Sequence, residues 1–327
     1  MKFLVTGGAG FIGSNLVRAL IGKGHSVRVL DDYTRGSRDR LNDVDICFYP
    51  GSVDRPEHRV SLGIASDGVD AVIHLAAVNG TANFYNRPGR VLGVGVRGIV
   101  NVMDACIARG VKELYIASSS EVYQGAHVVP TPENVPLIIP DPYNPRYSYA
   151  AGKIISEMMG LYYASEYLRR VVIFRPHNVY GPDMGDDHVI PHFARKLFES
   201  ILDSSNPGRT AFVLQGTGKE TRSYCHIDDA VLGILKVIEY GQHRGIYNVG
   251  IQQETSAETL ARIMGGYFGL ELDISPSPLA KGSASRRCPD ISKLRALDWE
   301  PKVSLREGLY SYLDWFTAKE KASCPAS

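Results

Sequence analysis

Residues 1–17 of the chain read MKFLVTGGAGFIGSNLV, and this stretch decides the fold. Residues 2–6 predict a buried strand, and the apolar spacing over residues 11–22 predicts a helix. Between these two elements lie three glycines spaced by three residues: Gly7, Gly10 and Gly13. A glycine turn before a helix lets backbone N–H groups approach a diphosphate closely. The stretch therefore predicts a dinucleotide site rather than a flexible surface loop.

Two acidic residues follow the next predicted strand, residues 26–30. Asp31 follows the glycines at nearly the distance in sequence that is typical of a carboxylate that binds the adenosine ribose hydroxyls. Asp31 and its neighbour Asp32 would repel a 2′-phosphate, so we expect NAD rather than NADP. Arg35 is the one nearby residue that would favour a phosphate, and we expect it to be a solvated loop arginine.

Strands and helices alternate over residues 1–176. Further strands are expected within residues 45–50, 70–76, 112–120 and 170–176, and helices near residues 91–109 and through 147–167. This order predicts an α/β fold with a doubly wound parallel sheet, a Rossmann domain that binds NAD. Residues 177–327 contain shorter elements between loops rich in Pro, Gly and Asp. We expect a smaller C-terminal α/β substrate-binding lobe there, with some chain returning to the first domain.

The composition excludes several classes of protein. Lys plus Arg total 36 against 35 Asp plus Glu, so the charge does not indicate a nucleic-acid binder or an anionic-membrane binder. Five scattered cysteines without a C-x-x-C pair favour a reducing, cytoplasmic location. We expect no signal peptide and no membrane span. His188 and His192 are four residues apart, but with no acidic or cysteine partner at ligand spacing they predict no metal.

Tyr149 and Lys153 are the first candidates for catalysis. They are four residues apart on the helix expected over 147–167, so both side chains lie on one face. A phenol is a poor base at neutral pH, but a nearby ammonium group and the positive nicotinamide ring would favour the phenolate. Ser119 ends a predicted strand, where parallel sheets bind ligands, and would donate a hydrogen bond to the reacting oxygen. Neighbouring Ser118 is interpreted only as part of the strand exit.

Several motifs, in this order, resemble those of extended short-chain dehydrogenases/reductases, within the NAD-dependent nucleotide-sugar epimerase/dehydratase group. They are TGGAGFIGS, LDDYTRG, HLAA, SSSEVY, Y-x-x-x-K, RPHNVYGP, TRSYCHIDD and RRCPDISKLRALDWEPKVSLREGL, and they cover nearly the whole chain. The resemblance implies a transient 4-keto sugar, formed by hydride transfer to bound NAD from a nucleoside-diphosphate sugar. It also implies a homodimer paired through the helices near 91–109 and 147–167.

The resemblance assigns roles to individual positions. The catalytic positions are Ser119, Tyr149 and Lys153, with Glu121 as a further candidate. Cofactor contacts are assigned to Gly7, Gly10, Phe11, Ile12, Gly13, Asp31, Asp32, Ser52, Val53, Leu75, Ala76, Ala77, Tyr149 and Lys153. Substrate contacts are assigned to Asn178, Arg222, Ser119 and Ser120, with Arg287 as a weaker candidate that could equally pair with Asp290.

The motif SSSEVY decides between the activities of the group. Glu121 resembles the glutamate of dehydratases and decarboxylases, and it could remove the C5 proton of a 4-keto sugar. Ser120 replaces the aspartate with which 4,6-dehydratases eliminate water. We therefore expect an epimerase first, with a decarboxylase or a dehydratase using Glu121 as the alternative. A strand-end glutamate in solvent is the structural interpretation.

Other positions depart from the pattern of the group. Gly95 replaces an asparagine of the active-site hydrogen-bond network, Ser52 replaces an adenine-binding aspartate, and Gln124 replaces a glycine. The loop over residues 77–85 should line the sugar pocket, and His177 either contacts substrate or packs. Outside the group, the alternatives are a net alcohol or steroid-type dehydrogenase and a non-catalytic dinucleotide sensor. Retention of the Ser, Tyr and Lys positions argues against the sensor.

Overall fold

The computed structural model describes residues 1–327 except 125, 203–207, 280–281 and 324–327. A seven-stranded sheet with the order β11-β6-β5-β4-β1-β2-β3 forms its centre, and every pair in it is parallel. The strands are β1 (Lys2–Thr6), β2 (Ser26–Asp31), β3 (Cys47–Pro50), β4 (Ala71–His74), β5 (Glu113–Ala117), β6 (Arg170–Pro176) and β11 (Ile246–Val249). This confirms the predicted doubly wound fold.

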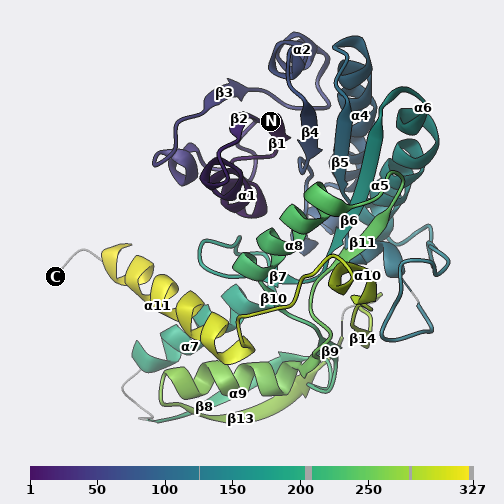
Figure 1. Ribbon diagram of the computed structural model, residues 1–327. Helices are drawn as coiled ribbons and strands as arrows, with labels where there is room; N and C mark the ends of the chain where they lie inside the picture. The colour runs from purple at the N-terminus through teal and green to yellow at the C-terminus, as the bar shows by residue number, and fades with distance from the viewer. Residues whose placement is uncertain (125, 203–207, 280–281, 324–327) are drawn as a thin grey trace.

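Helices cover both faces of the sheet (Figure 1). One apolar cluster joins the sheet to α1 (Phe11–Gly22), α8 (Ile227–Tyr240) and α10 (Ser292–Arg295). A second joins the opposite face to α2 (Arg59–Ser66), α3 (Thr81–Asn86), α4 (Pro88–Ala108), α5 (Tyr147–Met158) and η4 (Met159–Ala164). The short helix α6 (Ser165–Tyr167) follows η4 and has no buried residue. Short 3₁₀ turns are η1 (Arg38–Leu41), η2 (Pro56–His58) and η3 (Ser120–Tyr123).

The helix expected over 147–167 contains a π-helical stretch, η4, between α5 and α6. Gly160 lies in this stretch, and a Cβ there would come within 2.5 Å of Ile116 Cδ1 on β5. The helix approaches the sheet closely at this glycine, and in the same stretch the helix changes from α-helical to π-helical geometry.

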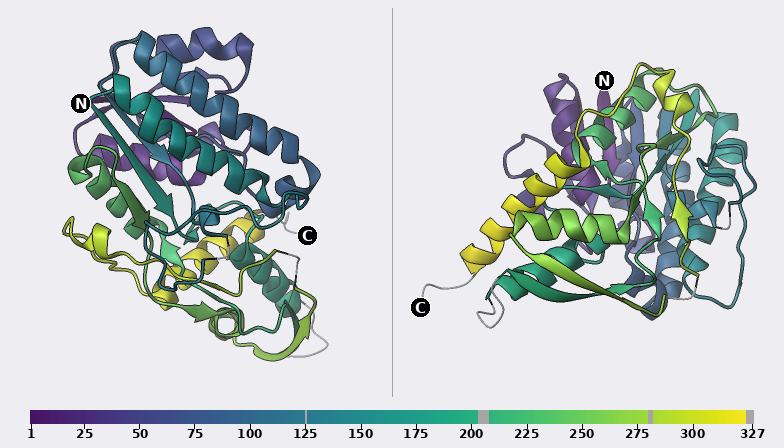
Figure 2. Two further views of the ribbon diagram at one scale, coloured as in Figure 1. Left: turned by 90° about the vertical axis from the view of Figure 1, so that its right-hand side faces the viewer. Right: turned by 90° about the horizontal axis from the view of Figure 1, so that it is seen from below.

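A third apolar cluster is the core of a smaller lobe that lies below the sheet in Figure 1. It contains α7 (Val189–Leu202), β8 (Arg209–Gln215), α9 (Ala257–Tyr267), β13 (Glu271–Ser277) and α11 (Leu305–Ser323). The two-residue strands are β7 (Val179–Tyr180), β9 (Thr221–Arg222), β10 (Cys225–His226), β12 (Thr255–Ser256) and β14 (Arg286–Arg287). Figure 2 shows the sheet with its helices and the smaller lobe from the side and from below. The chain returns from this lobe to the sheet through α8 and β11.

Helix α4 corrects the expectation that no segment has the length and apolar character of a membrane span. Among the described residues, it alone is long and apolar enough to cross a membrane by these two criteria. Buried helices of globular proteins meet the same criteria, and α4 packs on both the sheet and α5. Its apolar character is explained by the residues that it buries, such as Val94, Ile99 and Met103.

Candidate active site

The glycine turn joins β1 to α1, and its geometry requires glycine at two positions. Gly7 has φ +74°, and a Cβ there would lie 2.7 Å from the Ala76 nitrogen. A Cβ at Gly13 would lie 2.2 Å from the Gly7 carbonyl oxygen. The first turn of α1 has no side-chain cap and no acidic residue, so its N–H groups are available to an anion. This cradle fits the diphosphate of NAD.

One cavity extends from this turn to the ends of β4, β5 and β6. Many of the predicted cofactor positions line it: Gly7, Gly10, Phe11, Ile12, Gly13, Asp31, Asp32, Ser52, Val53, Leu75, Ala76, Ala77, Tyr149 and Lys153. The sheet topology brings them together, because the carboxyl ends of its parallel strands share one edge. The loop over 77–85 also contributes as expected, with Val78, Asn79 and Phe84 among the lining residues.

Asp31 lies at the adenosine end of the cavity and is buried. Its carboxylate accepts hydrogen bonds from the Ala9 nitrogen at 3.0 Å and the Tyr33 nitrogen at 2.8 Å. Burial raises the pKa of Asp31, although these two bonds oppose the effect. Burial also tends to raise the pKa of Asp32. This effect is outweighed by hydrogen bonds from Thr34 and Ser52 and by the charge of Arg90, so the pKa of Asp32 lies below its usual value.

The hydroxyl hydrogen of Ser52 at the adenine end is already engaged within the protein. Its hydroxyl donates to Asp54 at 2.8 Å, and Asp54 is ion-paired with Arg90 of α4. Val53 lies beside them, and its carbonyl accepts from Asn101 at 2.8 Å. Arg90 lines the cavity and also lies 3.6 Å from Asp32, so it links the two acidic positions. The sequence carries no local motif that would have identified Arg90.

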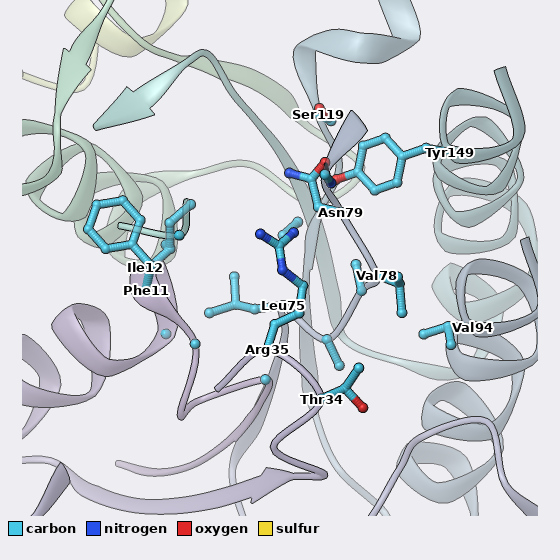
Figure 3. A pocket seen from close by; sticks show the side chains of 18 of the residues that line it. Phe11, Ile12, Thr34, Arg35, Leu75, Val78, Asn79, Val94, Ser119 and Tyr149 are labelled. Atoms are coloured by element: carbon cyan, nitrogen blue, oxygen red, sulfur yellow. Dashed lines mark hydrogen bonds between the residues drawn. The ribbon is translucent and has the colours of Figure 1, made fainter. Parts of the chain in front are cut away.

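Tyr149, Lys153 and Ser119 meet at the far end of the cavity, where Figure 3 shows Ser119 and Asn79 beside the Tyr149 hydroxyl. Both Tyr149 and Lys153 come from α5, and Phe84 stacks on the Tyr149 ring at 5.1 Å between centroids. The Lys153 ammonium nitrogen donates to the Ala117 carbonyl at 2.6 Å and lies 5.7 Å from the centre of the Tyr149 ring. The structure thus brings the three predicted catalytic residues together at one end of the cavity, and their catalytic role remains a prediction.

The electrostatics of this group correct one expectation. Burial raises the pKa of Tyr149 to about 12, although a hydrogen bond with Ser119 lowers it. Burial lowers the pKa of Lys153 to about 8. Burial thus outweighs the hydrogen bond of Ser119 and the charge of Arg35, so the protein groups alone favour the neutral phenol. A positive nicotinamide ring bound beside Tyr149 would favour the phenolate.

The sugar end of the cavity holds an ion-pair cluster around Glu121. Its carboxylate accepts from Arg287 Nη1 and from Gln124 Nε2, both at 2.5 Å, and lies 3.8 Å from Arg146 Nη2. Burial would raise the pKa of Glu121, but the charges of Arg287 and Arg146 lower it to about 2. Glu121 is therefore not a glutamate in solvent.

Arg287 pairs with Glu121 and not with Asp290, whose carboxylate instead accepts from Ser292. Both partners of the Glu121–Arg287 pair are mostly buried, with 18% and 8% of their side chains exposed. Arg146 also lines the cavity, although the sequence analysis did not predict it as a site residue. Its position three residues before Tyr149, on the same face at the start of the helix, is the signal that could have identified it.

The remaining substrate positions are only partly brought together. Asn178 and Ser120 line the cavity, and the Asn178 amide donates to the Ser223 carbonyl at 3.0 Å. Arg222 is not among the described residues that line it, and its guanidinium donates to the Ala284 carbonyl at 2.7 Å. Burial, and to a smaller extent the charge of Arg287, lower the pKa of Arg222 to about 10. His177 is fully buried and packs against Tyr123.

The structure explains why position 95 is a glycine. A Cβ at this position would lie 3.3 Å from the Cα of Gly152, so α4 and α5 touch there through their backbones. Ser156 of α5 also donates to the Gly95 carbonyl at 3.2 Å. The missing asparagine is therefore replaced by a close helix–helix contact.

Comparison with known proteins agrees with this geometry. The NAD dependent epimerase/dehydratase family model matches residues 3–250. The chain belongs to this family. The family is NAD-dependent, which agrees with the glycine cradle and with Asp31. Among the residues that the structure describes, no group of three or more metal-type ligands occurs.

Three members of the family illustrate the range of activities. UDP-glucuronic acid decarboxylase 1 of Arabidopsis thaliana is 31% identical over 312 residues, covering 94% of this chain and 68% of the plant protein. UDP-glucose 4-epimerase of Thermotoga maritima, solved with UDP-glucose, has a TM-score of 0.85 and 30% identity, covering 98% of this chain and 100% of that one. The dTDP-glucose 4,6-dehydratase DesIV of Streptomyces venezuelae, solved with NAD, has a TM-score of 0.86 and 29% identity, covering 98% of each chain.

Proposed function

We propose that the protein is an NAD-dependent nucleotide-sugar decarboxylase whose substrate is a UDP-linked uronic acid. The observation that carries this proposal is the excess of guanidinium groups at the sugar end. Glu121 is shared by Arg287 and Arg146, so one positive charge is left over. Within the described part of the chain, the buried Nε of Arg146 has no hydrogen-bond partner. A carboxylate on the sugar would supply both the charge and the acceptor.

The similarity to a UDP-glucuronic acid decarboxylase supports the same assignment. The sequence placed an epimerase first because Ser120 leaves no acid for water elimination, and the decarboxylase alternative now has the stronger support. A neutral sugar would supply no carboxylate to accept from the buried Nε of Arg146. A dehydratase would need a base for the C5 proton, and a carboxylate with a pKa of about 2 is a weak base.

The chemistry follows from the positions of the side chains. Bound NAD⁺ supplies the acceptor for the hydride of sugar C4 and later returns it. Tyr149 takes the proton of the C4 hydroxyl, with Ser119 as its hydrogen-bond partner. Lys153 lies on the same face of α5 as Tyr149, and its ammonium group is held by the Ala117 carbonyl at the end of β5.

A 4-keto uronic acid is a β-keto acid, so its C5–C6 bond breaks without a metal or an added acid. The electron pair of that bond moves onto the C4 carbonyl as carbon dioxide leaves, and C5 then takes a proton from water. Arg146 and Arg287 hold the departing carboxylate in place, while Glu121 orients the guanidinium groups. Asn178, which lines the cavity, is proposed for the diphosphate of the substrate. Arg222 has this role only by resemblance, because its guanidinium donates to the Ala284 carbonyl and is not part of the described lining.

The deciding experiment is incubation with UDP-glucuronic acid, UDP-glucose and dTDP-glucose, with the products measured by mass spectrometry. We expect loss of carbon dioxide from UDP-glucuronic acid and no change in the two neutral sugars. An unchanged mass with altered configuration would show an epimerase, and loss of water would show a dehydratase.

An Arg146 variant tests the observation directly. Arg146→Met should weaken binding of UDP-glucuronic acid roughly ten- to a hundredfold, as for loss of a hydrogen-bonded ion pair. Binding of UDP-xylose, which lacks the carboxylate, should stay within a few-fold of the wild type. Equal losses for the two ligands would contradict the proposed role.

A further inference from the structure

Arg35 does not extend into solvent as the sequence suggested. Its segment is fixed against the glycine turn, because the Ser37 nitrogen donates to the Ala9 carbonyl at 3.1 Å. Gly36 packs so closely that a Cβ there would lie 2.9 Å from the Ala9 carbonyl. From this anchored segment the Arg35 side chain, which is 26% exposed, points into the middle of the cavity (Figure 3).

The position of Arg35 along the cavity indicates which part of NAD it faces. Asp31 marks the adenosine ribose end, and Tyr149 marks the nicotinamide end. The guanidinium of Arg35 is near enough to Tyr149 for its charge to lower the pKa of that phenol, although burial has the larger, opposite effect. Figure 3 shows it between the first turn of α1, at Phe11 and Ile12, and the side of the cavity that carries Asn79. A dinucleotide that spans the two ends has its diphosphate in this middle position.

The charge of Arg35 is only loosely compensated. Its nearest carboxylate is Asp187 of the smaller lobe, with 3.7 Å between Nη2 and Oδ2. That separation exceeds a hydrogen bond. Within the described ranges of the chain, no side-chain hydrogen bond of Arg35 is present. By contrast, nearby Arg40 is fully engaged with Asp183, at 2.5 Å from Nε to Oδ2 and 2.9 Å from Nη2 to the carbonyl oxygen.

We propose that Arg35 binds the diphosphate of NAD from the side opposite to the N-terminus of α1. The helix contributes backbone N–H groups, and Arg35 contributes a guanidinium fork that suits two phosphate oxygens. Asp187 stays beside the guanidinium and connects the smaller lobe to the bound cofactor. Arg35 is thereby a cofactor-binding residue, and this assignment does not depend on which sugar the enzyme converts.

The test separates the diphosphate from the rest of the cofactor. Full-length protein freed of nucleotide is titrated calorimetrically with NAD⁺, ADP-ribose and adenosine, for the wild type, Arg35→Met, Arg35→Lys and Arg38→Met. Arg38 is the matched control, because it lies three residues further along at the start of η1, is exposed, and is not among the described cavity-lining residues. We expect Arg35→Met to weaken NAD⁺ and ADP-ribose roughly ten- to a hundredfold, as for hydrogen bonds between charged groups, with adenosine unchanged.

Arg35→Lys should recover part of this loss, because it keeps the charge without the fork, and Arg38→Met should bind all three ligands normally. Wild type and Arg35→Met are also titrated with NADP⁺. Three results would overturn the proposal: unchanged NAD⁺ affinity in Arg35→Met, equal weakening of adenosine, or a larger loss for NADP⁺ than for NAD⁺. The last would assign Arg35 to a 2′-phosphate. No sugar is present in the titrations, so failure of the decarboxylase proposal would leave these results unaffected.

Discussion

The Glu121 carboxylate and the Arg287 guanidinium meet at 2.5 Å, although the two residues are 166 positions apart in the chain. Glu121 lies in η3, directly after β5, and Arg287 lies in β14 of the smaller lobe. The pair therefore connects the sheet with the lobe at the sugar end of the cavity. It is both a part of the proposed substrate site and a contact between the sheet and the smaller lobe.

The Glu121 pair predicts a pH-dependent contribution to stability. The pKa of Glu121 is about 2 in the folded chain against an ordinary value of 4.5. On acidification the unfolded chain takes up this proton first, so the stabilisation is complete above about pH 5 and is lost as the pH falls toward 2. Glu121→Gln should lower the free energy of unfolding by about 3 kcal/mol at pH 7, because it leaves Arg287 buried without its carboxylate.

Urea denaturation of wild type and Glu121→Gln between pH 3 and pH 7 measures this effect, and the difference should shrink at the acid end. Asp273→Asn is a suitable control, because its pair with Arg209 is exposed and should contribute little at any pH. A constant difference across the range would contradict the assigned ion pair.

Tyr149 is expected to be necessary for turnover but not for binding of the cofactor. Tyr149→Phe keeps the ring that stacks on Phe84 and removes only the hydroxyl that exchanges the proton. Turnover of the nucleotide sugar should fall by about 10²–10⁴-fold. NAD⁺ affinity, measured by titration, should remain within a few-fold of the wild type. Near-normal turnover would refute the role of Tyr149 as the base.

The fold followed from the sequence because its determinants are local. The glycine turn, the apolar strands and the helical spacing each specify an element within about twenty residues, and right-handed parallel crossovers order them into one sheet. The same locality placed Tyr149, Lys153 and Ser119, since a four-residue helical spacing and a strand end suffice to position them.

The ion pairs of the site could not be predicted in the same way, because they depend on contacts between segments that are distant in the sequence. Arg287 was expected to pair with its neighbour Asp290, yet the lobe brings it to Glu121. Arg35 was expected in solvent, and only the contact of Gly36 with Ala9 directs it into the cavity. The pKa of Tyr149 also depends on burial, which a spacing pattern does not report.

A row of exposed apolar side chains predicts self-association. Ile155, Met158 and Tyr162 are three and four residues apart along α5 and η4, and 39%, 41% and 62% of each is exposed. We expect a second copy of the chain to cover this face, so that the protein elutes as a dimer. Ile155→Glu should shift light-scattering mass toward the monomer, whereas Ile201→Glu on α7, also exposed, should not. A wild type that remains monomeric at micromolar concentration would contradict this expectation.

The contact of Gly95 with Gly152 predicts that an asparagine is not tolerated at position 95. Because a Cβ at Gly95 would lie 3.3 Å from Gly152 Cα, Gly95→Asn must separate α4 from α5. We expect a loss of about 1–3 kcal/mol in the free energy of unfolding, as for overpacking. Gly89→Asn on the same helix is the control, since a Cβ there meets nothing within 4 Å. Because α5 also carries Tyr149 and Lys153, Gly95→Asn should lower turnover as well, and full stability with full activity would show that the two helices are not held together at this point.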